Sequence, residues 1–91
     1  MRTSRRFLIS GRVQGVGFRY FVQSIAIRES LSGWVRNLED GRVETAAAGD
    51  ADAMERFERA LRLGPSGARV DAVAVDATFP MSEHATGFHI R

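Results

Sequence analysis

The sequence predicts an α+β fold in which two helices cover one face of an antiparallel sheet. Three observations predict it: two segments with helical spacing of apolar residues, four segments with the composition and period of strands, and an Asp-Gly pair that joins two of these strands as a tight hairpin. The order along the chain is strand, helix, strand, strand, helix, strand, and a short strand is expected after them. This βαββαβ order, two interleaved βαβ units, is that of the ferredoxin-like sandwich.

The first strand and the first helix meet at a glycine-rich turn. Apolar and polar side chains alternate over residues 5–13, which is the period of a half-buried strand, and glycine and glutamine end the pattern at residues 14–17. The apolar side chains then take helical spacing, which predicts a helix over residues 18–30. The residues expected to face the core from these two elements are Phe7, Ile9, Val13, Phe18, Phe21, Val22, Ile25 and Ala26.

The middle of the chain is predicted to form a hairpin. Residues 34–38 are rich in strand formers, and the sequence Glu39-Asp40-Gly41 has the Asp-Gly signal of a tight turn. Residues 42–48 should therefore return as a third strand, antiparallel to the second.

The second helix has clear signals at both ends. Asp50 is the expected N-cap, and Gly64-Pro65 ends the helix. Its buried stripe should consist of Met54, Phe57 and Leu61. The acid–arginine pairs spaced to interact on its exposed side are Asp52/Arg56, Glu55/Arg59 and Glu58/Arg62.

The last part of the chain is predicted to hold a strand over residues 69–79, a polar loop over 80–86 and a short strand over 87–91. Val70 and Val73 differ in parity, so a bulge is expected between them. The core candidates of these strands are Val70, Val73, Val75, Phe79, Phe88 and Ile90.

Composition narrows the class of protein. Ninety-one residues suit one domain, and we expect residues 1–91 to form it. No apolar run approaches the roughly 20 residues that span a bilayer, so no membrane partner is expected. Cysteine is absent, which excludes disulfide scaffolds and thiol catalysis and is compatible with a cytoplasmic protein. Residues 1–36 carry seven arginines and one acid, so the basic half of the chain is suited to facing an anion.

The turn after the first strand has the features of an anion site. Glycines permit positive φ, so consecutive main-chain N–H groups can point at one centre, and the helix that follows adds its free N–H groups and positive partial charge. Arg19, in the first turn of that helix, adds a permanent forked cation. A phosphoryl group fits these donors best. The alternative is a glycine turn beside a solvent-facing arginine.

Asn37 is the second candidate. A right-handed crossover makes the first and second strands parallel, so their C-terminal ends lie on one edge of the sheet. With the third strand between them, two strand spacings leave roughly 10 Å between the glycine turn and Asn37. A phosphoryl group and one water would fill that gap. The alternative is an asparagine that caps the turn of residues 39–41.

Two segments carry a resemblance to a known family. The segments are Gly11-Arg12-Val13-Gln14-Gly15-Val16-Gly17-Phe18-Arg19 and Gly33-Trp34-Val35-Arg36-Asn37, followed by Gly41, Val43 and Gly49. They resemble the two signatures of acylphosphatases at the required spacings, and the resemblance extends over nearly the whole chain. It implies an enzyme that hydrolyses small acyl phosphates to a carboxylate and inorganic phosphate, with no metal and no cofactor.

The resemblance also assigns residues. It implies that Arg19 and Asn37 are catalytic, and that Asn37 holds the attacking water. The phosphate-binding residues that it implies are Gln14, Gly15, Val16, Gly17, Phe18 and Arg19. Because the loop recognises the tetrahedral anion, inorganic phosphate should be a competitive inhibitor as well as a product. We expect a monomer.

Parts of the sequence also resemble or allow other functions. Residues 15–22 resemble the aromatic RNA-binding stretch of RRM domains, but that motif belongs on a third strand, and residues 42–48 contain no aromatic residue. No nucleic-acid partner is therefore expected. His84 and His89 have no further histidine or cysteine with which to bind a metal. The main alternative is a module that binds a phosphorylated ligand without hydrolysing it, and a similar domain opens larger carbamoyl-transfer proteins. Because this chain ends after its last strand, a free-standing enzyme is the expectation.

Overall fold

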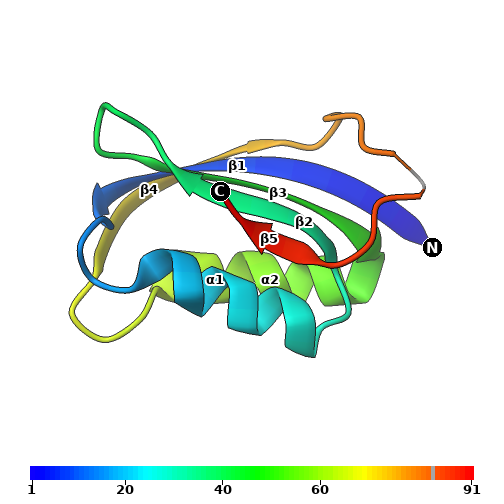
Figure 1. Cartoon of the computed structure of the whole chain (residues 1–91), viewed down its shortest axis with the longest axis horizontal. Helices are drawn as coiled ribbons and strands as arrows, with labels where there is room; N and C mark the ends of the chain where they lie inside the picture. Colours follow the sequence, from blue (N-terminus) through cyan, green and yellow to red (C-terminus); the bar gives the residue numbers. More distant parts are fainter. Residues whose placement is uncertain (83) are drawn as a thin grey trace.

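The computed structural model describes residues 1–82 and 84–91, and its elements follow the predicted order (Figure 1). They are β1 (Arg2–Arg12), α1 (Phe18–Arg28), β2 (Ser32–Asn37), β3 (Val43–Asp50), α2 (Ala51–Leu63), β4 (Arg69–Asp76) and β5 (Phe88–Ile90). The predicted fold class is confirmed, with element ends that differ from the expected ones by up to three residues.

The sheet has the strand order β4-β1-β3-β2-β5, and both helices pack on the same face of it (Figure 1). β3 is antiparallel to both β1 and β2, and β5 adds to β2 in parallel. β1 and β2 therefore run in the same direction, and both end at the edge of the sheet where α1 begins. This confirms the prediction that the glycine turn and Asn37 belong to one edge, with the third strand between their strands.

The core lies between the sheet and the helices, and Phe57 of α2 is at its centre. The Phe57 ring meets Phe7 of β1 at 5.8 Å between centroids and Phe88 of β5 at 6.2 Å, both edge-to-face. All three rings are buried, and each contributes about 1.5–3 kcal/mol by leaving water. The predicted buried stripe of Met54, Phe57 and Leu61 is confirmed.

β4 departs from the prediction at its far end. Val75 is 41% exposed, although it pairs with buried Phe7, because β4 is an edge strand that the helices cover incompletely. The strand ends at Asp76, so Phe79 lies beyond it and is not a core residue of the strand; the Arg6 guanidinium lies 5.9 Å from its ring centroid. The predicted bulge is confirmed, because Ser10 pairs with Ala72 and Gly11 with Val70, which leaves one extra residue on β4.

The ion pairs of α2 also differ from the prediction, since only one of the three expected pairs forms. The observed pairs are Glu58–Arg62 at 3.0 Å, Glu55–Arg5 at 3.0 Å and Arg56–Glu29 at 2.8 Å. Arg5 belongs to β1 and Glu29 follows α1, so partners from other elements replace two of the local i,i+4 pairs.

Glu44 joins the three strands that lead to the site edge. Its carboxylate accepts a hydrogen bond from Arg6 of β1 at 2.5 Å and one from Arg36 of β2 at 2.6 Å. Burial disfavours its charge, but the two guanidinium groups outweigh that effect and hold the pKa of Glu44 below its usual value. The ionised carboxylate therefore links β1 and β2 across β3.

Candidate functional site

The turn between β1 and α1 depends on two glycines in the left-handed region. Gly15 has φ of 74° and Gly17 has φ of 78°, and a Cβ on either would meet nothing within 4 Å, so the requirement is conformational and not one of space. Such residues, alternating with ordinary ones, turn successive main-chain N–H groups toward one centre. Gly17 is also the N-cap of α1, and the N–H of Phe21 donates to its carbonyl at 3.1 Å.

The N-terminus of α1 is positive and uncapped. No side chain caps it, its first turn contains no acid, and Arg19 lies in that turn. The first N–H groups of a helix have no partner within the helix, and their partial charge makes a cation there unfavourable. The ion pairs in the part of the chain that the structure describes do not include Arg19. Free N–H donors, helix dipole and guanidinium thus all favour an anion at one place.

A cavity of about 110 Å³ joins this turn to the end of β2. The residues that line it are Val13, Gly15, Gly17, Phe18, Arg19, Tyr20 and Asn37. The structure therefore brings Asn37 together with Arg19 and with three of the glycine-turn residues selected from the sequence. Gln14 and Val16, also selected, do not line the cavity.

Asn37 has a buried oxygen that no described residue satisfies. Among the residues described, its Oδ1 is the buried side-chain polar atom without a hydrogen-bond partner. Asp40, rather than Asn37, caps the β2–β3 turn, since the N–H of Arg42 donates to its carboxylate at 3.1 Å. Leaving a buried acceptor unpaired costs about 1–3 kcal/mol, so this oxygen indicates a role other than turn capping.

The side chain of Gln14 is used within the protein. Its Nε2 donates to the carbonyl of Leu38 at 2.7 Å and to the carbonyl of Arg42 at 3.0 Å. Both amide hydrogens are therefore committed to the β2–β3 turn, and the main-chain N–H is the donor that Gln14 retains for an anion.

Two residues of the cavity were not selected from the sequence. Val13 was assigned only to the core, where it is indeed 1% exposed. Tyr20 is 71% exposed and lies beside Arg19 in the first turn of α1. Helical spacing gives no signal for Tyr20, because consecutive residues of a helix do not share a face.

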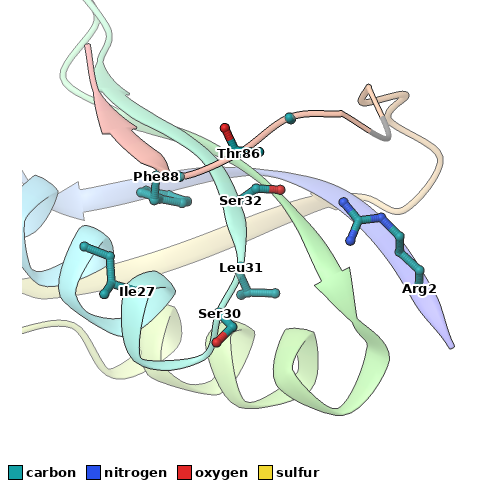
Figure 2. Close-up of a pocket in the computed structure, with 9 residues that line it drawn as sticks. Arg2, Ile27, Ser30, Leu31, Ser32, Thr86 and Phe88 are labelled. Atoms are coloured by element: carbon teal, nitrogen blue, oxygen red, sulfur yellow. The ribbon is translucent and has the colours of Figure 1, made fainter.

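A larger cavity, of about 430 Å³, lies at the other end of the sheet (Figure 2). Ser30 and Leu31 follow α1 and Ser32 begins β2, and all three line it with Arg2 and Phe88. This is the C-terminal end of α1, where the helix dipole is negative and disfavours an anion. The smaller cavity is therefore the better anion site, despite its size.

The described part of the chain offers neither a membrane-spanning helix nor a metal cluster. No helix in it has both the length and the apolar character needed to cross a membrane. Residues 1–82 and 84–91 also contain no group of three or more His, Cys, Asp or Glu side chains placed to hold a metal ion. His89 Nε2, on β5, lies 3.1 Å from the carbonyl oxygen of Thr86, which precedes that strand.

Comparison with known proteins assigns the family. A family model described as acylphosphatase matches residues 5–90. The chain is 48% identical to an acylphosphatase of Thermus thermophilus over 85 residues, which are 91% of this chain and 92% of that protein. It is also 48% identical to an acylphosphatase of Koribacter versatilis over 77 residues, 85% of this chain and 70% of that protein. The crystal structure of acylphosphatase from Bacillus subtilis superposes with a TM-score of 0.92 at 41% identity, covering 100% of this chain and 99% of that one.

Fold and sequence together thus define a small hydrolase of the α+β class. The chain belongs to the acylphosphatase family. Its reaction is hydrolysis of the carboxyl–phosphate bond of acyl phosphates, as the sequence signatures predicted.

Proposed function

We propose that Arg19 and the main-chain N–H groups of residues 14–19 hold the phosphoryl group of an acyl phosphate, and that Asn37 holds the attacking water. The observation that carries this proposal is the 110 Å³ cavity, which Arg19, the first residues of α1 and Asn37 line together. Asn37 also has a buried Oδ1 without a hydrogen-bond partner among the described residues. An amide oxygen accepts a hydrogen bond from water, which orients the lone pair of the water toward the phosphoryl group.

The chemistry requires little more than these parts. The water oxygen bonds to phosphorus and loses one proton, which ends on a phosphate oxygen of the product. The bond from phosphorus to the acyl oxygen breaks, and its electron pair leaves with the carboxylate. Phosphoryl transfer passes through a loose transition state, so positioning and charge stabilisation supply most of the catalysis. The leaving carboxylate has a pKa of about 4 and needs no general acid. This accounts for two signatures without His, Asp or Glu at the proposed catalytic positions.

Cavity size supports recognition of the phosphoryl group rather than the acyl group. The cavity of about 110 Å³ is small beside the roughly 300–1,000 Å³ of pockets that enclose a whole drug-sized ligand. Because the first residues of α1 and Arg19 line it, we assign it to the phosphoryl group and place the acyl group outside it. We therefore propose that small acyl phosphates of varied acyl structure are substrates, and that inorganic phosphate competes with them.

The position of bond cleavage tests the mechanism. Hydrolysis of benzoyl phosphate in ¹⁸O-labelled water should place the label in inorganic phosphate, because the water attacks phosphorus. Label in benzoate instead would mean attack at the carbonyl carbon and would refute the role given to the glycine turn. The same assay with EDTA should show unchanged turnover, since we propose catalysis by protein groups alone; loss on chelation that a divalent ion restores would refute that part.

The remaining properties are also proposals. We infer that residues 1–91 act as one domain, as a monomer in the cytoplasm, without nucleic-acid or membrane partners. Support for the single domain comes from the Bacillus subtilis acylphosphatase, which this chain covers over 99% of its length. Sedimentation of the purified chain and fractionation of cells that express it test the oligomeric state and the location.

A further inference from the structure

We propose that Gln14 is a positioning residue: its side-chain amide sets the place of Asn37 relative to the phosphate-binding turn. This inference rests on the proposed role of Asn37. It gives Gln14 a task beyond that of a phosphate ligand, and it follows from where the two amide hydrogens go.

The first step is the geometry of the strand ends. β3 pairs with β1 as far as Ile9 opposite Val43, and it pairs with β2 as far as Asn37 opposite the same Val43. Past Val43 the hairpin closes on itself, where the N–H of Leu38 donates to the carbonyl of Arg42 at 2.8 Å. Main-chain pairing from β1 has ended at this level, so it does not hold the start of the hairpin turn.

Beyond the last main-chain pair of β1 with β3, the side-chain amide of Gln14 connects the turn after β1 to the hairpin. Its Nε2 donates to the carbonyls of both Leu38 and Arg42, at 2.7 and 3.0 Å, so it contacts the two residues that close the hairpin. Leu38 follows Asn37 directly, and Gln14 precedes Gly15, the first left-handed glycine of the turn. One half-buried side chain therefore ties the segment that carries Asn37 to the segment proposed to bind phosphate.

The second step is the freedom of Asn37 itself. Its Oδ1 has no hydrogen-bond partner among the described residues, so no such bond fixes that oxygen in place. The direction of the oxygen then depends on where the main chain of residues 37–38 lies. A displacement of about 1 Å between a bound reactant and a positioning group can slow a reaction by up to about 10²-fold. The two bonds from Gln14 are placed to prevent such a displacement.

The test is a double-mutant cycle with kcat and phosphate inhibition as readouts. Gln14→Met removes both donors and keeps an unbranched side chain, and Gln14→Leu removes both donors without adding a charge next to the phosphate-binding turn. Gln23→Met is the matched control, because Gln23 also donates its Nε2 to a carbonyl, that of Phe88 at 3.1 Å, away from the cavity. Each substitution is made alone, and both Gln14 substitutions are also made with Asn37→Ala; thermal unfolding reports the folded fraction.

We expect both Gln14 substitutions to lower kcat by about 10-fold and to change the inhibition constant of phosphate by less than about 2-fold. In the Asn37→Ala background the same substitutions should lower kcat by less than about 2-fold, because there is no oxygen left to position. Gln23→Met should leave kcat unchanged. A purely structural role for Gln14 would not produce this dependence on Asn37.

Each contrary result has a distinct meaning. If Asn37→Ala lowers kcat but the Gln14 effect persists in full in that background, the positioning role is wrong and the proposed function stands. A Gln14 variant whose kcat falls only in proportion to its folded fraction, or whose phosphate inhibition weakens as much as kcat, also overturns the positioning role. If folded Asn37→Ala keeps full kcat, the proposed role of Asn37 fails, and this inference fails with it.

Discussion

The two helices of this protein begin in opposite ways. α2 begins at Asp50, whose carboxylate accepts a hydrogen bond from the N–H of Asp52 at 3.1 Å, and Asp52 adds a second acid to the first turn. α1 begins at Gly17, which offers no side-chain cap, and its first turn contains Arg19 and no acid. Both helices pack on the same face of the same sheet (Figure 1).

The two helix N-termini differ in what they favour: that of α2 stabilises its helix, and that of α1 is suited to bind an anion. An absent N-cap side chain costs about 0.5–2 kcal/mol, although glycine recovers much of it, and a cation in the first turn costs about 0.3–1 kcal/mol more. α2 shows that this fold can supply an acidic cap. α1 omits one at the place where a phosphoryl group would contact free N–H donors, which is the pattern expected of a binding site that sacrifices local stability.

Removing the cation from the first turn of α1 should have the largest effect on activity. Arg19→Ala should lower kcat/KM by about 10³-fold or more, since an arginine that holds phosphoryl oxygens acts both in binding and in the transition state. Phosphate inhibition should weaken in the same variant. Arg62→Ala, in the last turn of α2, is the control and should leave both constants unchanged. If Arg19→Ala is folded and turns over normally, the phosphate site does not lie at the N-terminus of α1.

Asn37→Ala should have the next largest effect, and a different one. The expected loss is about 10²-fold in kcat, as for one positioned polar group, while the inhibition constant of phosphate stays nearly the same, because Asn37 is assigned to the water. Kinetics with phosphate as inhibitor, on protein shown to be folded, measure both. Equal loss of kcat and of phosphate affinity would make Asn37 a phosphate ligand instead.

An acidic N-cap on α1, like the one on α2, tests whether the free N–H groups of α1 bind the anion. Gly17→Asp places a carboxylate at the N-terminus of α1, and Asp is among the residues that tolerate the left-handed conformation. The carboxylate would compete with a bound anion for the same N–H groups, so the inhibition constant of phosphate should rise by about 10-fold, which corresponds to about 1.4 kcal/mol. Gly17→Asn, which is similar in size but uncharged, should raise it less. Equal effects of the two would mean that backbone strain, and not charge, is responsible.

The smallest effect is expected from the cap of α2 itself. Asp50→Ala should lower Tm by a few degrees and leave kcat unchanged, because its carboxylate caps α2 and does not line the cavity. The N–H of Asp52 donates to this carboxylate and holds the pKa of Asp50 below its ordinary value of 3.8. A lowered pKa in the folded state means that the stabilisation is present above the unfolded pKa and is lost as the pH falls through the folded one. The Tm difference between wild type and Asp50→Ala should therefore shrink below about pH 4; a constant difference would contradict it.

Much of this architecture was predictable because it depends on local spacing. The stripe of Met54, Phe57 and Leu61 and the cap at Asp50 follow from periodicity and from helix chemistry. The meeting of the glycine turn with Asn37 followed from the crossover rule, which needs only the order of the elements.

The sequence predictions that were wrong or incomplete share a physical cause: the features concerned depend on residues distant in the sequence. Arg5 and Glu29 displaced two ion pairs that local spacing favoured on α2. Val75 has a core residue's pattern, but its burial depends on how far the helices extend over the edge strand. The bonds of Gln14 join residues 24 and 28 positions apart, and a glutamine at the start of a glycine-rich turn gives no sign that its amide reaches the hairpin.

The pairing of β1 determines how the protein must refold. Arg2 lies opposite Asp50 on β3, and Arg6 lies opposite Asp76 on β4, so β1 closes loops that contain most of the chain. Closing such loops costs chain entropy before the contacts form, and folds dominated by non-local pairs fold in milliseconds to seconds rather than microseconds. The glycine turn and Asn37 are brought to one edge only when β3 has inserted between β1 and β2. Recovery of acyl phosphate hydrolysis after dilution from denaturant therefore reports completion of the sheet, whereas helical circular dichroism reports elements that can form earlier.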